Sequence, residues 1–171
     1  GLNFLHENNL IFRDLDPRSI LLDKKGFIKL TFPGYETVDT PTIVNPYYSP
    51  DFLMSNANTI AADWYSLGCI LYEMVCGYPP FWNDDQNKLK KTILEDSPKF
   101  PAHVQPNTKD LIIKLLEKDP NKRLGSGSKG WEEIKSHPYF NDVDWKKLVD
   151  ERFTPDYIPT EQDQYCFSLD I

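Results

Sequence analysis

The residues best suited to chemistry lie in one short stretch, residues 12–19, which reads FRDLDPRS. This stretch contains two carboxylates, Asp14 and Asp16, and ends on the hydroxyl of Ser19. A carboxylate can act as a general base or as a ligand for a hard cation such as Mg²⁺. Neither the three histidines nor the three cysteines follow the spacing of a metal site. We therefore expect no metal site built from these residues, and stretch 12–19 is the first candidate for function.

Five segments of the chain, taken in order, resemble signature motifs of eukaryotic-type protein kinases. Residues 12–19 resemble the catalytic loop, which in the family reads His-Arg-Asp-Leu-Lys-Pro-x-Asn. The other four are Phe32-Pro33-Gly34 in the place of Asp-Phe-Gly, Ser49-Pro50-Asp51 in the place of Ala-Pro-Glu, Asp63–Gly68 in the place of Asp-x-Trp-x-x-Gly, and Asp119–Gly125 with its distal arginine. Five matches in the family's order identify the chain as a kinase-like sequence.

Three later segments resemble the AGC group of these kinases, near the cAMP-dependent and S6-kinase-like enzymes. They are Gly77–Phe81, His137–Phe140 and Val143–Trp145. The resemblance implies a kinase C-terminal lobe over residues 1–140 and the beginning of an AGC-type C-terminal tail over residues 141–171. The family's glycine-rich loop, strand lysine and partner glutamate belong to an N-terminal lobe, which is absent from these 171 residues.

The resemblance also implies that most ligands for phosphate and metal are lost. Asp14 matches the catalytic aspartate that orients the substrate hydroxyl, although it could instead accept backbone hydrogen bonds in a tight loop. Asp16 replaces the lysine that neutralises the transferring phosphate, Ser19 replaces a magnesium-binding asparagine, and Phe32 replaces the main magnesium carboxylate. Phenylalanine cannot bind magnesium. We therefore expect that Asp14, although retained, does not support phosphate transfer. ATP and Mg²⁺ are expected as cofactors only if a longer, active kinase contains this chain.

The positions that are architectural in the family are retained. The resemblance implies that Asp63, on a buried helix, accepts hydrogen bonds from the catalytic-loop backbone, and that Phe12 packs in the regulatory spine. It also implies an ion pair between Asp51 and Arg123. Aspartate at position 51 is shorter than the family's glutamate, so we expect this pair to form with strain or through a water molecule.

Residues 32–51 are rich in Pro, Thr and Tyr and have no helical period, which predicts a long ordered loop. Thr40 in this loop lies at the offset of an activation-loop phosphosite in the family. The architectural Arg13 could receive its phosphate, but Thr37 replaces the second basic ligand. Thr40 is therefore a candidate modification site.

The pattern of apolar residues predicts a mainly α-helical fold with a small β-hairpin, the α+β class of a kinase C-terminal lobe. Two short β-rich runs, residues 20–22 and 27–30, flank the turn Asp23–Gly26 and predict the hairpin. The expected helices are an N-terminal one that carries Leu2, Phe4, Leu5 and Leu10, followed by Asp63–Val75, Asn87–Glu95, Asn107–Lys118 and Trp131–Lys135.

Composition sets limits on the kind of protein and on its partners. The chain is 40% hydrophobic and 13% aromatic, which predicts a folded globular domain. A net charge of -7 disfavours nucleic acid, and the most apolar run, Tyr65–Val75, is shorter than the roughly 20 residues that span a membrane. Three unpatterned cysteines favour reduced thiols inside the cell, in the cytoplasm. The expected partners are proteins, and another kinase is one candidate.

Three functions are compatible with these features. The first is a catalytically inactive kinase lobe, a pseudokinase, that acts as a protein-binding or allosteric scaffold. The second is part of a serine/threonine kinase that transfers the γ-phosphate of ATP to protein hydroxyls. The third is a truncated product without a selected function. We favour the first, because the skeleton is retained while the metal and phosphate ligands are lost.

Overall fold

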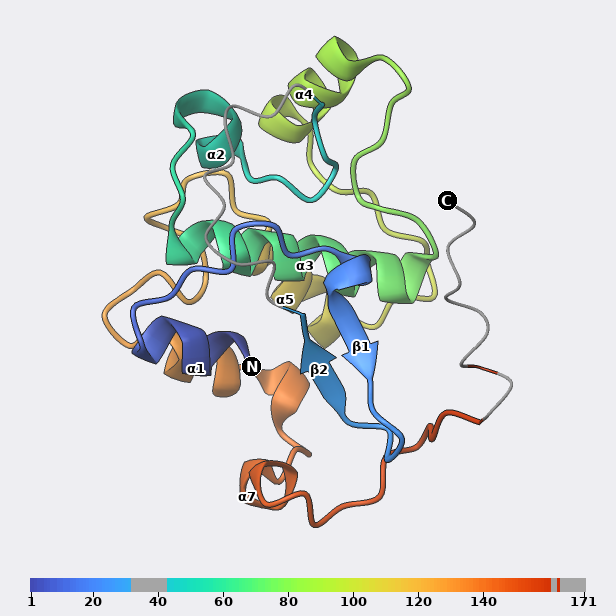
Figure 1. The fold of residues 1–171 in the computed structure, drawn as a ribbon. Helices are drawn as coiled ribbons and strands as arrows, with labels where there is room; N and C mark the ends of the chain where they lie inside the picture. The colour runs from blue at the N-terminus through green and yellow to red at the C-terminus, as the bar shows by residue number, and fades with distance from the viewer. Residues whose placement is uncertain (32–42, 161–162, 164–171) are drawn as a thin grey trace.

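The computed structural model describes residues 1–31, 43–160 and 163, and these residues form a mainly helical fold with one pair of strands (Figure 1). In chain order its elements are α1 (Leu2–Glu7), the 3₁₀ turn η1 (Pro17–Ser19), β1 (Ile20–Leu22), β2 (Ile28–Leu30), α2 (Pro50–Ser55), α3 (Ile60–Cys76), α4 (Gln86–Glu95), α5 (Pro106–Leu115), α6 (Trp131–Lys135), the 3₁₀ turn η2 (Pro138–Phe140) and α7 (Trp145–Val149). The expected combination of helices with a small hairpin is confirmed.

The two strands form the predicted antiparallel hairpin, with Ile20 opposite Leu30. The side chain of Asp23 closes the turn, because its Oδ1 accepts hydrogen bonds of 2.9 Å from the backbone N–H groups of Lys25 and Phe27. Gly26 has a φ of 86°, a conformation that glycine adopts without steric cost. The turn sequence thus sets the position of the hairpin.

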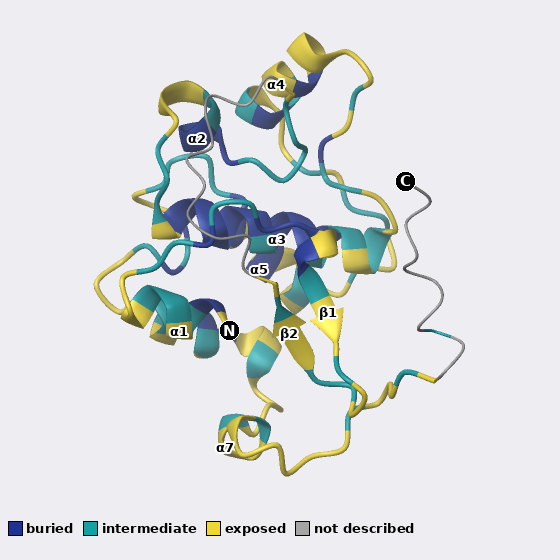
Figure 2. Cartoon of the chain, in the orientation of Figure 1, coloured by how far each residue is buried: buried dark blue, intermediate teal, exposed yellow. Residues whose placement is uncertain are grey.

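Helix α3 is the central element of the fold, and Figure 2 shows it buried over most of its length. Trp64 and Ile70 belong to one core cluster, which also contains residues from α1, α5 and α6. Tyr65, Cys69 and Tyr72 belong to a second cluster, which extends to α4. A helix that is apolar on nearly all sides has to be covered on all of them. The other helices therefore pack around α3.

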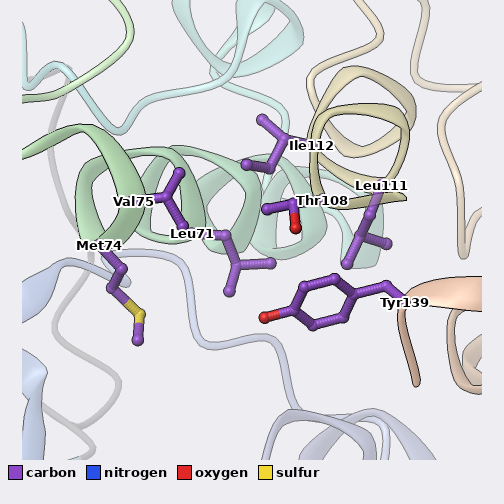
Figure 3. A pocket seen from close by; sticks show the side chains of 7 residues that line it. All are labelled: Leu71, Met74, Val75, Thr108, Leu111, Ile112 and Tyr139. Carbon is purple, nitrogen blue, oxygen red and sulfur yellow. The ribbon is translucent and has the colours of Figure 1, made fainter. Parts of the chain in front are cut away.

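Helix α5 packs on α3 at Gly68. A Cβ atom at position 68 would lie 2.8 Å from the Cβ of Leu115, closer than such atoms approach in proteins. The missing side chain at Gly68 therefore allows the close approach of the two helices. A small cavity of about 30 Å³ remains between α3, α5 and Tyr139 (Figure 3), enough for about one water molecule.

The central helix begins earlier than predicted. It starts at Ile60 rather than Asp63, and the hydroxyl of Thr59 caps it by accepting a hydrogen bond of 3.1 Å from the backbone N–H of Ala62. Threonine is a good N-cap residue, so this signal was present in the sequence. As a consequence, Asp63 lies inside the first turn and its side chain is available for other contacts.

Other boundaries also differ from the sequence prediction. Helix α1 ends at Glu7, so Leu10, which was expected in this helix, lies outside it. The predicted loop ends with the start of α2, which Ser49 caps and Pro50 begins, as is common at helix N-termini. Helix α5 ends at Leu115 instead of Lys118. The carbonyl groups of Glu117 and Lys118, which follow it, accept hydrogen bonds from the side chain of Arg123. The short helix α7 was not predicted.

None of the described helices combines the length and apolar character needed to cross a bilayer.

Lys118 is a partly buried cation close to α3 and α4. Its ammonium group donates a hydrogen bond of 2.5 Å to the carbonyl of Ile93 and lies 4.0 Å from the centre of the Phe81 ring. Burial lowers the pKa of Lys118 from 10.5 to about 8, mainly because the ammonium loses contact with water. The folded state therefore favours the neutral form of this lysine over the charged form.

We predict that the contribution of Lys118 to the free energy of unfolding increases as the pH rises from about 8 to about 10. In this interval the unfolded chain still binds the Lys118 proton while the folded chain releases it, so this contribution grows with pH. The full penalty is present below pH 8. Allowing for the remaining solvent contact, we expect a gain of about 1–2 kcal/mol.

Urea unfolding at about pH 7.5 and about pH 9.5 measures this gain. Burial raises the pKa of the Cys69 thiol and of the Tyr65 hydroxyl, which has the opposite effect on stability in this range, so the gain is read as a difference between variants. From the lower to the higher pH, Lys118→Met should gain about 1–2 kcal/mol less than the natural chain, whereas the exposed Lys90→Met should follow the natural chain. An unchanged pH dependence in Lys118→Met would contradict the assignment.

Candidate functional site

The candidate loop, residues 12–19, is attached to the central helix through Asp63. The Asp63 carboxylate is fully buried and accepts hydrogen bonds of 2.8 Å from the backbone N–H groups of Phe12 and Arg13. Arg13 has a φ of 76°, in the left-handed region that costs a non-glycine residue on the order of 1 kcal/mol. The two hydrogen bonds hold the loop in this conformation. Phe12 itself is buried in the first core cluster.

His6 of α1 is the third partner of Asp63. Its Nε2 lies 2.8 Å from Asp63 Oδ2, and its ring meets the ring of Trp64 edge-on with the centres 4.8 Å apart. The sequence analysis gave His6 no role. Its spacing was a usable signal, because Leu2 and His6 are four residues apart and so lie on the same face of a helix, the face on which Leu2 is buried.

Asp14 occupies the half-buried centre of the loop. In the part of the chain that the structure describes, its carboxylate accepts no hydrogen bond, neither from a side chain nor from the backbone. Burial raises the pKa of Asp14, the negative charge of Asp16 raises it further, and Arg18 partly opposes both effects. The backbone contacts that a purely structural role would require are therefore not found among the described residues.

Asp16 is buried and bound to its own loop. Its Oδ1 accepts a hydrogen bond of 2.8 Å from the Arg18 backbone N–H, and its Oδ2 accepts hydrogen bonds from the Arg18 side chain at 2.9 Å and 2.5 Å. The first contact caps the turn η1, and the other two neutralise the carboxylate with an exposed guanidinium. The sequence analysis predicted the loss of a neutralising lysine at position 16, but it did not predict this local partner.

Ser19 completes the same turn. Its hydroxyl donates a hydrogen bond of 2.7 Å to the Asp16 carbonyl and accepts one of 3.2 Å from the Asp16 backbone N–H. We refer to Asp16, Arg18 and Ser19 as the closed cluster, because their polar groups bind one another. The Asp16 carboxylate and the Ser19 hydroxyl would have to give up these contacts before either could bind Mg²⁺. Among the described residues, no group of three His, Cys, Asp or Glu side chains could hold a metal ion.

Two predicted positions, Phe32 and Thr40, lie outside the described residues. The loss of the magnesium carboxylate at position 32 and the phosphosite at position 40 stay predictions. The side chain of Arg13, the proposed phosphate ligand, lies in the described part at the start of the loop.

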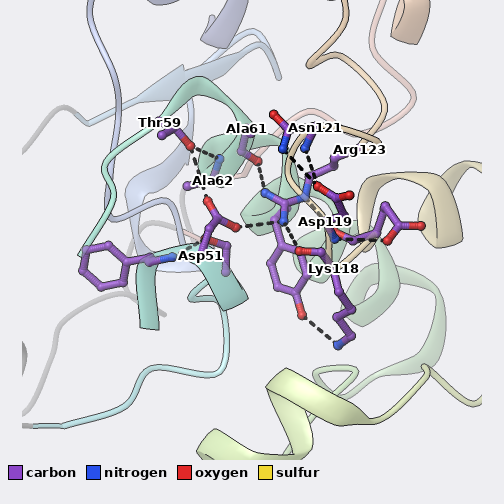
Figure 4. A network of polar contacts seen from close by, with 12 residues as sticks. Asp51, Thr59, Ala61, Ala62, Lys118, Asp119, Asn121 and Arg123 are labelled. Carbon is purple, nitrogen blue, oxygen red and sulfur yellow. Dashed lines mark hydrogen bonds and ion pairs between the residues drawn. The ribbon is translucent and has the colours of Figure 1, made fainter. Parts of the chain in front are cut away.

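Asp51 and Arg123 form the predicted ion pair, at the N-terminal end of the central helix (Figure 4). Arg123 Nη2 lies 2.8 Å from Asp51 Oδ1, so the two side chains meet directly without a bridging water. Arg123 also donates to the carbonyls of Ala61 and Glu117 at 2.7 Å and 2.8 Å. Aspartate reaches the arginine because α2 begins at Pro50 and brings position 51 close to α3.

Comparison with known proteins agrees with the order of motifs. A sequence model described as "Protein kinase domain" matches residues 1–140. The chain is 41% identical over 168 residues to the serine/threonine-protein kinase gad8 of Schizosaccharomyces pombe, a match that covers 94% of this chain and 29% of that protein. It is 39% identical over 167 residues to cAMP-dependent protein kinase type 3 of Saccharomyces cerevisiae, covering 95% of this chain and 42% of that protein.

A third relative is the RAC-beta serine/threonine-protein kinase A of Xenopus laevis. The chain is 35% identical to it over 167 residues, and the match covers 93% of this chain and 34% of the relative. The chain thus spans less than half the length of each of these three relatives.

We predict that Arg123→Ala lowers the free energy of unfolding by about 3–5 kcal/mol, because it leaves the Asp51 carboxylate buried without its cation. Urea unfolding followed by circular dichroism measures the loss. The matched control Lys122→Ala removes an exposed cation from the neighbouring position and should change stability by about 0.5 kcal/mol or less. If the two variants lost similar amounts of unfolding free energy, the buried ion pair would stabilise the fold no more than an exposed one.

Proposed function

Because the chain belongs to the protein kinase family, with relatives of the AGC group, we propose that it forms the C-terminal lobe of a kinase domain that has lost phosphotransfer. In this proposal it acts as a pseudokinase, a protein-binding or allosteric scaffold whose partners include other kinases. We also propose that it works inside the cell, where the thiols of Cys69 and Cys76 would remain reduced, as both are free in the structure.

The closed cluster is the observation that carries this proposal. Phosphoryl transfer depends on cationic groups that hold the phosphates and on ligands that hold the metal ions. At the family's lysine position this chain has Asp16, whose carboxylate is bound to Arg18. At the asparagine position it has Ser19, whose hydroxyl is bound to the backbone of Asp16. The loop is therefore stable in itself without a nucleotide.

A protein-binding role is supported by the surface of the lobe. The loop that follows α3 exposes two large aromatic side chains, Tyr78 and Trp82, which are 52% and 62% exposed. Aromatic residues are enriched in protein interfaces, where they provide large contact areas. The net charge of -7 favours basic protein surfaces over nucleic acid as partners.

One observation favours the second candidate, an active serine/threonine kinase. The Asp14 carboxylate keeps a raised pKa and no hydrogen-bond partner in the described residues, as a general base would require. A base alone does not supply the phosphate and metal contacts, so this candidate requires ligands from elsewhere in a longer protein.

We predict that neither ATP nor ATP with magnesium raises the melting temperature of this chain. A ligand at about 100 times its dissociation constant would add about 2.7 kcal/mol, which corresponds to a shift of about 5–11 °C for a domain of this size. Differential scanning fluorimetry measures the shift. The combined substitutions Asp16→Lys, Ser19→Asn and Phe32→Asp restore the family's residues, and the resulting variant should bind magnesium–ATP more tightly than the natural chain.

The decisive control is Asp14→Ala. If the natural chain transferred phosphate to a protein substrate and Asp14→Ala abolished that transfer, the scaffold proposal would be wrong. The active-kinase candidate would then replace it.

A further inference from the structure

Four serine or threonine residues of the chain are followed directly by proline, namely Thr40, Ser49, Ser97 and Thr154. Proline has no backbone N–H and a fixed φ, and it holds the residue before it in an extended conformation. A hydroxyl residue before proline therefore has a distinct shape, which the proline-directed class of serine/threonine kinases selects. Each of the four hydroxyls is a candidate for modification by such a kinase.

Burial removes one of these candidates. Ser49 is 1% exposed, and its hydroxyl caps α2 by accepting a hydrogen bond of 3.2 Å from the backbone N–H of Phe52. Thr40 lies outside the described residues. Ser97 and Thr154 are both exposed, so their flanking residues decide between them.

Exposure of the hydroxyl is not sufficient for modification by a kinase. The enzyme binds several residues on each side of the hydroxyl, and these residues have to leave the surface of the folded chain. The free energy of such local opening is low where few hydrogen bonds and few buried apolar contacts hold the segment. The contacts of the flanking residues therefore predict how readily each hydroxyl is modified.

The residues on both sides of Ser97 are held firmly. Just before it, in the last turn of α4, Ile93 is fully buried, and its carbonyl accepts a hydrogen bond of 2.5 Å from the Lys118 ammonium. Just after it, the carbonyl of Lys99 accepts a hydrogen bond from the buried hydroxyl-bearing ring of Tyr72. A kinase could bind Ser97 only if the end of α4 unwound and these contacts broke.

Thr154 lies in a segment without such contacts. We refer to residues 151–160 as the strap. Within the part of the chain that the structure describes, the backbone of residues 153–156 forms no hydrogen bond. The strap therefore has no helix or strand that would have to unwind around Thr154.

The strap is held against the hairpin turn by a small number of side-chain contacts (Figure 1). The ring of Phe153 meets that of Phe27 edge-on with the centres 5.7 Å apart, and Phe153 remains 41% exposed. Next to it, a Cβ atom at Gly26 would lie 3.0 Å from the Cβ of Pro155. These contacts are near the surface, so the free energy needed to release the strap is low.

The charged residues near Thr154 indicate which class of kinase fits. Glu151 and Arg152 lie three and two positions before it, and Asp156 lies two positions after it. This mixture forms neither a basic nor an acidic cluster, so a kinase that reads clustered charge gains little here. Pro155 is the distinctive feature next to the hydroxyl, and it fits a proline-directed enzyme.

We propose that Thr154 is a phosphorylation site for a proline-directed serine/threonine kinase. In the reaction the Thr154 Oγ1 forms a bond to the γ-phosphorus of ATP, and the bond between that phosphorus and the β–γ bridging oxygen breaks. ADP leaves, and the hydroxyl proton passes to the general base of the acting kinase. This site does not depend on the scaffold role proposed above, since a separate enzyme supplies the catalysis.

The test uses the intact chain, magnesium–ATP and a mitogen-activated protein kinase as the proline-directed enzyme. Mass spectrometry follows the phosphate at Thr154 and at Ser97 over time, and a sample without the added kinase gives the background. Peptides of residues 149–159 and 92–102 are treated in the same way. Because the peptides have no fold, they report how well the kinase reads each sequence.

The structure predicts different outcomes at the two positions. Thr154 in the chain should react within about threefold of the rate in its peptide, whereas Ser97 in the chain should react at least about tenfold more slowly than in its peptide. Thr154→Ala should remove most of the phosphate gained by the chain, and Thr154→Ser should keep it. The proposal is wrong if the 149–159 peptide gains no phosphate, or if Thr154 in the chain reacts as slowly relative to its peptide as Ser97 does.

Discussion

The buried carboxylate of Asp63 is the interaction on which the rest of the site depends. A charged group without solvent contact is tolerated only where hydrogen-bond donors surround it. Here the donors come from His6 of α1 and from the backbone of Phe12 and Arg13. One carboxylate in the first turn of α3 therefore fixes the end of α1, the left-handed backbone of Arg13 and the start of the candidate loop. The same carboxylate fixes the His6 ring, whose Nε2 lies 2.8 Å from it.

Arg123 is a buried cation close to the same end of α3. Its guanidinium binds the Asp51 carboxylate and the Ala61 carbonyl, so it joins α2 to the first turn of α3. It also donates hydrogen bonds to the carbonyls of Glu117 and Lys118, which follow the end of α5. The two buried charges hold the segments before and after α3 against the same end of that helix. Neither arrangement involves a group that a nucleotide would supply.

The sequence predicted the hairpin, the central helix and α6 well, because a turn signal or a long apolar pattern specified each of them locally. It missed α2, where Ser49 and Pro50 gave a capping signal inside a stretch that otherwise lacked helical period. For the site, family motifs led to Asp63 and Arg123. The contact between Asp16 and Arg18 is local, and Asp16 before Pro17 was an N-cap signal that the sequence analysis did not use. The contact between His6 and Asp63 depends on the fold, because 57 positions separate the two residues.

The positions that match the family's motifs and those that differ from them carry different information about function. Asp63 and Arg123 are buried, and their loss would destabilise any kinase-like fold, so their presence carries no information about catalysis. Positions 16 and 19 differ, because an active loop needs their side chains free to bind phosphate and metal. In this chain those side chains instead cap and close the turn η1. A loop that satisfies its own polar groups needs no ligand to hold its shape, which is the physical basis of the proposed scaffold role.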